Sequence, residues 1–311
     1  MNRIAVFGIG STNFRSVLGS PSEGFFDEVA TEPTRPYELE TQTLEALERL
    51  AAKADGDLDA VGIATAGLVD DAGTVFSFDT PGGETVPQVR LGERIEASFG
   101  LPTAVANDCT ASALGEYAFG AGADGDYRTV AHVTFGTGIG GGVVEDGHLL
   151  RGEHGHAGEV GLLPIVADGD LESCGVRGAW EAYCSGRGIG QYVRSLLAEE
   201  SRETTLDHET VTAEAVFEAV DAGDQVAEDY LDRIGRLNAA GLGGVCNAHD
   251  PGLVTVGGGV ALNNAEVLLE AIEAHLDDYL FVERPALEVT PLGDFIGLYG
   301  SLALADQNGR K

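Results

Sequence analysis

The chain has 311 residues, which is long enough for two domains with sizeable cores. It carries 51 acidic and 18 basic residues, and this net charge of −33 excludes nucleic acids and anionic membranes as expected partners. Lysine occurs only as Lys53 and Lys311, so the other basic residues are arginine. We interpret the acidic excess and the scarce lysine as adaptation of a halophile to molar salt, where charges are screened over roughly 3 Å.

The cysteines indicate a reducing compartment. Cys109, Cys174, Cys184 and Cys246 form no C-x-x-C pair, so we expect free thiols rather than a disulfide framework. The sequence starts directly with an apolar strand, and it contains no apolar run of 18 residues. We therefore expect a cytoplasmic protein.

The first part of the chain alternates strands with helices. Strands are predicted at 4–7, 15–18, 60–64 and 103–106, and helices at 38–53, 91–99 and 107–119. A stretch rich in Gly and Asp at 121–126 predicts a domain boundary. We expect a small α/β domain formed by residues 1–120 plus 295–311, and a large α/β domain formed by residues 121–294.

Helices dominate the second part after a strand pair that begins at Thr129. They are predicted at 179–198, 213–222, 224–246 and 264–280, with a final helix from about 295. The helix at 224–246 is expected to stop before Pro251, because proline cannot continue a helix.

Three glycine-rich turns follow strand-like runs, at 8–12, 136–142 and 257–259. Glycine lets the backbone approach an oxyanion and direct several N–H groups at it. The pair Asn107-Asp108 lies between the first two turns. This order predicts a nucleotide held at several points beside one carboxylate base, which is the layout of a phosphotransferase.

Two other nucleotide motifs are disfavoured. The middle turn satisfies G-x-G-x-x-G, but the chain continues from Val143 to His148 as a strand and tight turn rather than as a helix. No G-x-x-x-x-G-K-[ST] sequence is present, which excludes a P-loop.

Five segments together resemble the ROK family of sugar kinases. They are Gly8–Asn13, Val61–Asp70, Asn107–Glu116, Gly152–Gly161 and Pro251–Gly259. The resemblance covers essentially the whole chain. It implies a two-domain α/β fold of the actin-like, hexokinase (ribonuclease H-like) type, with the active site in the inter-domain cleft.

The resemblance also implies a role for individual residues. Asp108 would be the general base, and Asn107, Glu159, Glu181 and the backbone near Gly67 would bind the sugar. The expected ATP-binding residues are Gly10, Ser11, Thr12, Thr137, Gly138, Gly257, Gly258 and Gly259. Phosphoryl transfer needs positioning, Mg²⁺ on the ATP and one base, and a helix N-terminus stabilises a carboxylate. The alternative for Asn107-Asp108 is a plain helix cap.

The chain departs from the family pattern at two places. Gly8 replaces the first aspartate of D-x-G-x-T, and Asp70, Asp79 and Glu116 are open candidates for its role. Of the four residues that bind a structural zinc in the family, only Cys174 is kept, because the other positions hold Leu162, Glu172 and Ala179. One thiolate cannot build a zinc site, so no structural zinc is expected, and we do not expect His154 and His156 to replace it.

The leading hypothesis is an ATP-dependent hexose kinase that phosphorylates the 6-hydroxyl, most simply a glucokinase. An N-acylamino-sugar or fructose kinase of the same family is the alternative, and a non-catalytic sugar- or nucleotide-binding protein is the alternative from another class. A DNA-binding repressor is rejected because seven residues precede Gly8 and the charge is unfavourable. The expected partners are the hexose and ATP, with a homodimer suggested by the resemblance.

Overall fold

The computed structural model describes residues 3–54, 58–123, 125–200 and 202–309, and these form two compact units. Unit 1 holds the described residues up to 126 together with 142–158 and those from 294 on, and unit 2 holds 127–141 and 159–293. Residues 142–158 were expected in the domain 121–294, but they are grouped with unit 1. Their contacts explain this, because the Gln307 side chain donates to the Gly147 carbonyl at 2.8 Å.

Unit 1 is built on a sheet of order β3-β2-β1-β5-β9, with β4 also paired to β2. Strand β1 is antiparallel to β2 and parallel to β5, and β5 is parallel to β9. The strands are β1 (Ile4–Ile9), β2 (Asn13–Ser20), β3 (Gly24–Phe25), β4 (Ala30–Pro33), β5 (Ala60–Thr65) and β9 (Thr103–Asn107). Strand β1 is buried on both faces, with Phe7 in one core and Val6 in the other, as expected for a sheet covered on both sides.

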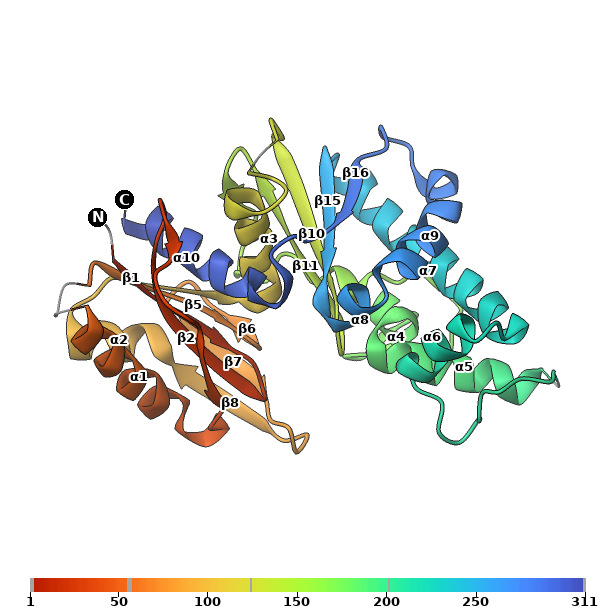
Figure 1. Cartoon of the computed structure of the whole chain (residues 1–311), viewed down its shortest axis with the longest axis horizontal. Helices are drawn as coiled ribbons and strands as arrows, with labels where there is room; N and C mark the ends of the chain where they lie inside the picture. The colour runs from red at the N-terminus through yellow and green to blue at the C-terminus, as the bar shows by residue number, and fades with distance from the viewer. Residues whose placement is uncertain (1–2, 55–57, 124, 201, 310–311) are drawn as a thin grey trace. The chain divides into compact units, whose positions relative to one another are not determined.

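Helices cover the two faces of this sheet (Figure 1). Helix α1 (Leu39–Lys53) and helix α2 (Leu91–Phe99) pack on the face that carries Phe7. Helix α3 (Asp108–Phe119) and helix α10 (Ile296–Gly309) pack together on the other face. The Ser301 hydroxyl donates to the Phe7 carbonyl at 3.0 Å and so fixes α10 to β1, almost 300 residues away in the sequence.

A small antiparallel sheet in unit 1 was not predicted. It contains β6 (Leu68–Val69), β7 (Thr74–Asp79) and β8 (Thr85–Arg90). It begins directly after Gly67, so it helps to fix the segment 67–70 that the resemblance assigns to the sugar.

Unit 2 contains the parallel strands β10 (Thr129–Phe135), β15 (Leu253–Gly257) and β16 (Ala286–Val289). They belong to a sheet of order β12-β11-β10-β15-β16, in which β11 (Ile139–Glu145) follows the second glycine turn and β12 is His148–Leu149. The predicted strand and tight turn after Gly138 are therefore confirmed, and a Rossmann helix is excluded at this place. The helices are α4 (Trp180–Cys184), α5 (Gly186–Glu199), α6 (Ala213–Asp221), α7 (Gln225–His249), α8 (Gly258–Asn263) and α9 (Ala265–Leu276).

One predicted helix is wrong, because residues 179–198 form two helices rather than one. Helix α4 ends at Cys184, and Ser185 has an extended backbone and caps α5 by accepting from the Gly188 N–H at 3.0 Å. The same hydroxyl donates to the Glu181 carbonyl at 2.7 Å. Serine competes for backbone hydrogen bonds in this way, so it favours a helix start over a helix interior.

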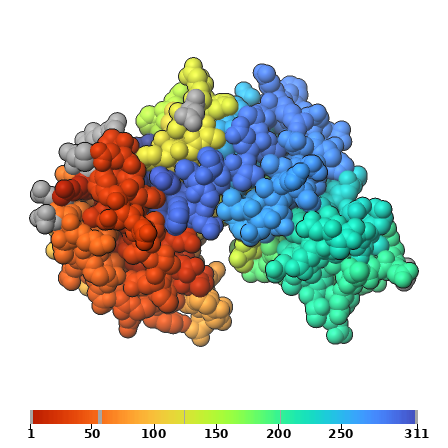
Figure 2. Space-filling view, viewed as in Figure 1, coloured from red at the N-terminus to blue at the C-terminus, as the bar shows by residue number. Residues whose placement is uncertain are grey.

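Side chains fill the space between the ribbons within each unit, as the space-filling view shows (Figure 2). Among the described residues, no helix combines the length and the apolar character that crossing a bilayer requires.

We predict that Gly62→Ala destabilises unit 1. A Cβ on Gly62, in β5, would lie 2.1 Å from the Ser301 carbonyl oxygen, so α10 would have to move away from the sheet. Overpacking of this kind costs about 1–3 kcal/mol, or a few degrees of melting temperature at roughly 2–4 °C per kcal/mol. Calorimetry measures the shift. Gly82→Ala is the matched control, because its Cβ would meet nothing closer than 3.8 Å, and equal melting temperatures for both variants would contradict the packing argument.

Candidate functional site

The junction between β9 and α3 places the proposed base. Asn107 is the N-cap of α3, and its side-chain oxygen accepts from the N–H groups of Cys109 at 3.0 Å and Thr110 at 3.3 Å. The expected cap role is therefore real. The Asn107 amide nitrogen also donates to the Gly67 carbonyl at 3.0 Å. One side chain thus holds two of the predicted sugar-side segments together.

Asp108 is the first residue of α3, where the helix dipole favours negative charge. Its carboxyl accepts from the Cys109 N–H at 2.9 Å. Burial raises the pKa of the Asp108 carboxyl, against the hydrogen bond from Cys109, which lowers it. A carboxylate with a raised pKa is a better proton acceptor than an ordinary aspartate.

The backbone conformation at position 67 requires glycine. Its φ of 91° lies in the left-handed region, and a Cβ there would be 2.7 Å from the Phe76 carbonyl oxygen. Gly155, in the segment 152–158, packs equally closely, since its Cβ would be 2.7 Å from the Val69 carbonyl oxygen. Unit 1 thus brings together three predicted segments around 67–70, 107–108 and 152–158.

A cavity of about 530 Å³ lies beside these segments. It is lined by Leu68, Asp70, Asp71, Ala72, Phe76, Glu153, His154 and His156. Among the described residues, no three His, Cys, Asp or Glu side chains are grouped so that they could hold a metal ion, His154 and His156 included.

Gly8 lies in β1 opposite Arg15, and a Cβ on it would be 3.1 Å from the Leu298 side chain. Three acids are candidates for the role of the aspartate that Gly8 replaces, and each of them already accepts a local hydrogen bond. Asp70 accepts from the N–H groups of Ala72 and Thr74, Asp79 accepts from the Thr85 hydroxyl, and Glu116 accepts from the Ala121 N–H. Glu116 is also two turns along α3 from Asp108, about 12 Å of helix rise.

The first glycine turn joins β1 to β2. The Gly10 N–H donates to the Asn13 carbonyl at 2.9 Å, and the Thr34 hydroxyl donates to the Gly10 carbonyl at 2.6 Å. Ser11 is half-buried and Thr12 is exposed. The turn is therefore held by the residue that follows β4, and the Thr12 side chain is accessible to solvent.

The second glycine turn lies in unit 2 and is closed by a Gly136 N–H bond to the Gly138 carbonyl at 2.9 Å. The Glu181 carboxylate accepts from the Ile139 N–H at 2.9 Å, and a Cβ on Gly138 would lie 2.6 Å from the same carboxylate oxygen. The structure thus brings Glu181 directly against the turn that carries Thr137 and Gly138.

Glu159 is exposed and precedes a short 3₁₀ helix, Val160–Leu162. Gly161 in that helix packs on the start of β11, because a Cβ there would be 2.0 Å from the Ile139 carbonyl oxygen. Both predicted sugar carboxylates of unit 2 therefore belong to segments that contact Ile139.

The third glycine turn connects β15 to α8. Gly258 has a φ of 81°, and its Cβ would be 2.5 Å from the Phe135 carbonyl oxygen, so the end of β10 and this turn lie in backbone contact. His132 on β10 packs behind Gly257, because a Cβ on Gly257 would be 2.9 Å from the imidazole Cε1. His132 is not predicted from the sequence, where its only signal is a polar residue within an otherwise apolar strand.

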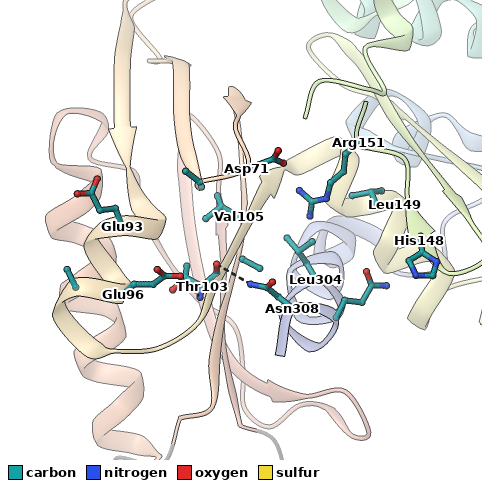
Figure 3. Close-up of a pocket in the computed structure, with 15 residues that line it drawn as sticks. Asp71, Glu93, Glu96, Thr103, Val105, His148, Leu149, Arg151, Leu304 and Asn308 are labelled. Atoms are coloured by element: carbon teal, nitrogen blue, oxygen red, sulfur yellow. Dashed lines mark hydrogen bonds between the residues drawn. The ribbon is translucent and has the colours of Figure 1, made fainter. Parts of the chain in front are cut away.

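A larger cavity of about 1280 Å³ in unit 1 shares Asp71 and Ala72 with the cavity of about 530 Å³. It lies between α2, β9, α10 and the segment around Arg151 (Figure 3). Asp71, Glu93, Glu96, His148 and Arg151 contribute polar groups to it. None of the predicted sugar or phosphate residues lines either of these two cavities, so neither cavity by itself identifies the active site.

Comparison with known proteins extends these observations. Residues 5–308 match the ROK family. A glucokinase of Streptomyces coelicolor is 34% identical over 285 residues, which cover 88% of this chain and 87% of that protein.

Two solved structures share the fold. A ROK hexokinase from Thermus thermophilus superposes with a TM-score of 0.86 at 29% identity, over 99% of both chains. A ROK family glucokinase from Streptomyces griseus, in complex with glucose and AMPPNP, superposes with a TM-score of 0.74 at 31% identity, over 98% of this chain and 100% of that one.

We predict that His132 makes folding sensitive to acid. Its Nδ1 is 2.9 Å from the Thr255 hydroxyl, and burial lowers the pKa of its imidazole from 6.5 to about 3. Below pH 6.5 the unfolded chain therefore binds a proton that the folded chain does not. The free energy of unfolding falls by up to about 1.4 kcal/mol per pH unit as the pH drops from 6.5 towards 3.

Urea unfolding of the wild type and of His132→Gln, measured from pH 7.5 to pH 4 at constant salt, tests this. The difference between the two proteins isolates the imidazole from the many carboxylates, which titrate in both. The wild type is expected to lose more stability than the variant as the pH falls. Parallel stability curves would contradict the burial of a neutral His132.

Proposed function

Because the chain belongs to the ROK family, we propose that it is an ATP-dependent hexose kinase that phosphorylates the 6-hydroxyl of its sugar, most simply of glucose. The observation that supports this best is the setting of Asp108. It is a carboxylate with a raised pKa at the start of α3, next to an asparagine that holds the sugar-side segment at Gly67. A protein that only binds a sugar has no need of such a base.

In the proposed reaction, Asp108 accepts the proton of the 6-hydroxyl while the hydroxyl oxygen attacks the γ-phosphorus of ATP. The bond between the γ-phosphorus and the bridging oxygen breaks, and ADP leaves with the electron pair. The rate gain comes from positioning and from one base, as in other phosphoryl transfers. Asp108 then releases its proton to solvent.

We assign sugar recognition to Asn107, Glu159, Glu181 and the backbone at Gly67. Sugar hydroxyls both donate and accept, so carboxylates and amides suit them. Asn107 uses its oxygen for two cap hydrogen bonds and one amide hydrogen for the Gly67 carbonyl, so its second amide hydrogen remains to donate to a sugar hydroxyl.

We assign the ATP phosphates and adenosine to the three glycine turns, at Gly10–Thr12, Thr137-Gly138 and Gly257–Gly259. A Cβ on Gly138 would lie 2.6 Å from the Glu181 carboxylate, and one on Gly258 would lie 2.5 Å from the Phe135 carbonyl oxygen, so both turns require glycine. Glycine also lets backbone N–H groups approach a phosphate. Magnesium usually keeps several waters and binds through substrate phosphates with one or two carboxylates. We therefore assign the Mg²⁺ to the bound ATP, with which it would arrive as part of the substrate.

We predict that Asp108→Asn folds normally and loses sugar phosphorylation. The cap of α3 belongs to Asn107, and an amide at 108 can still accept from the Cys109 N–H, so the fold does not depend on the charge. Loss of the base lowers kcat by about 10²–10⁴. A coupled assay for ADP over a panel of hexoses measures this. Asp27 is an exposed acid of the same unit, so Asp27→Asn controls for the change in charge. Near-wild-type turnover by Asp108→Asn would contradict the assignment of Asp108 as the base.

We also propose that the protein works in molar salt. With 51 acidic and 18 basic residues, most carboxylates have no basic residue available to pair with. The ion pairs that form, such as Arg35 with Glu45 and Arg49 with Glu32, are largely exposed and individually weak. Repulsion among the excess carboxylates then depends on screening by salt.

The expected result is a melting temperature that rises steadily with KCl from about 0.1 M, where the Debye length is about 10 Å, to above 1 M, where it is about 3 Å. Calorimetry over this series measures it. Sucrose at matched osmolality is the control, because it stabilises folded proteins without screening charge. A melting temperature that does not depend on KCl would refute salt adaptation.

The use of ATP as a substrate and the four free cysteines support a cytoplasmic location. We propose a homodimer on the family resemblance alone. No structural zinc enters this proposal, because Cys174 is exposed and stands without a set of neighbouring ligands among the described residues.

A further inference from the structure

The Glu181 carboxylate is held at both of its oxygens. One oxygen accepts from the Ile139 N–H at 2.9 Å, and the other accepts from the Ser173 hydroxyl. A serine hydroxyl has one proton, and an ionised carboxylate can only accept, so Ser173 is the donor of this pair. The carboxylate is therefore fixed from two sides before any ligand binds.

Ser173 is in turn fixed by a tight hairpin. It ends strand β13 (Glu172–Ser173), which pairs with β14 (Val176–Arg177), and Ser173 is opposite Val176. The two turn residues, Cys174 and Gly175, have φ values of 50° and 77°. Two positive φ values are the signature of the two-residue turn that matches the twist of a hairpin, so the turn sets the register of Ser173.

The base of this hairpin is tied to the backbone around Glu181. The Gly178 N–H donates to the Leu171 carbonyl at 2.8 Å, and the Trp180 N–H donates to the Leu163 carbonyl at 2.9 Å. Trp180 is fully buried, and its indole N–H donates to Asn238 at 2.7 Å. Hairpin and helix start thus form one hydrogen-bonded frame around a half-buried carboxylate.

We propose that Ser173 is a positioning residue for sugar recognition, which it serves by holding Glu181 against the second glycine turn. The inference rests on the proposed function and adds a residue to it. Two of the roughly four lone-pair directions of the carboxylate are occupied by Ser173 and Ile139, and the others remain for sugar hydroxyls. Without Ser173 the carboxylate keeps only the hydrogen bond from the Ile139 N–H, so the side chain gains rotational freedom, and ordering it lowers the affinity for the sugar.

The test compares Ser173→Ala, Ser173→Thr and a matched control, Ser195→Ala, which removes another half-buried hydroxyl of unit 2 that donates to a carbonyl at 2.7 Å. Steady-state kinetics with glucose and Mg·ATP give the two KM values separately. Ser173→Ala is expected to raise the glucose KM about tenfold while the ATP KM changes less than about twofold. Ser173→Thr keeps the hydroxyl and suits a strand, so it is expected to restore the glucose KM.

A second measurement does not depend on activity. Amide hydrogen exchange at Ile139, followed by NMR, is expected to become about tenfold faster in Ser173→Ala and to stay unchanged in Ser195→Ala, because a Glu181 carboxylate held at one oxygen alone moves more and protects that N–H less. An unchanged glucose KM in Ser173→Ala overturns the positioning role, and so does failure of Ser173→Thr to restore it. If the wild type phosphorylates no sugar, the proposed function fails, and the exchange result alone then decides whether Ser173 holds Glu181.

Discussion

The part of the candidate site that lies in unit 1 depends on the hydrogen bonds of the Asn107 side chain. A helix that starts directly after a parallel strand leaves its first N–H groups unsatisfied, and Asn107 satisfies two of them with one oxygen. The nitrogen of the same side chain holds the Gly67 carbonyl, so the cap also positions the segment that begins the small sheet β6-β7-β8. Asp108 is thereby left out of the cap, with its charge supported by the helix terminus.

In unit 2, three neighbouring segments pack closely on the second glycine turn. The turn at Gly136–Ile139 has the Glu181 carboxylate against Gly138, Gly161 against the Ile139 carbonyl, and a Gly186 N–H donating to the Gly136 carbonyl at 2.8 Å. A Cβ on Gly138 would lie 2.6 Å from the carboxylate, one on Gly161 would lie 2.0 Å from the Ile139 carbonyl oxygen, and one on Gly186 would lie 3.0 Å from the Gly136 carbonyl oxygen. The glycines around this turn therefore let neighbouring segments pack on it from several directions.

The acidic composition makes it harder to recognise functional carboxylates from sequence, because most acids of this chain are exposed. The structure separates them by their contacts. Asp70, Asp79 and Glu116 close local turns or helix ends, while Asp108 has a raised pKa and Glu181 contacts the second glycine turn. Burial and partners, rather than residue type, distinguish the proposed base and the proposed sugar ligand from a surface charge.

The sequence alone determined the elements whose signals are local. The helices that begin near Leu39, Leu91 and Asp108 occur within a residue of their predicted starts, and the strand after Gly138 excludes a dinucleotide fold. Five short motifs in a fixed order were enough to identify the family. These features depend on periodicity, capping and turn residues, all of which act over a few positions.

Only the tertiary structure decided the features that depend on distant pairs. It grouped 142–158 with unit 1 through contacts such as that of Gln307 with Gly147. It also brought Ser173 to Glu181, and buried His132 behind Gly257. Such contacts join residues that are 8 to 160 positions apart, so no local propensity encodes them, and they exist only once the sheets and helices have packed.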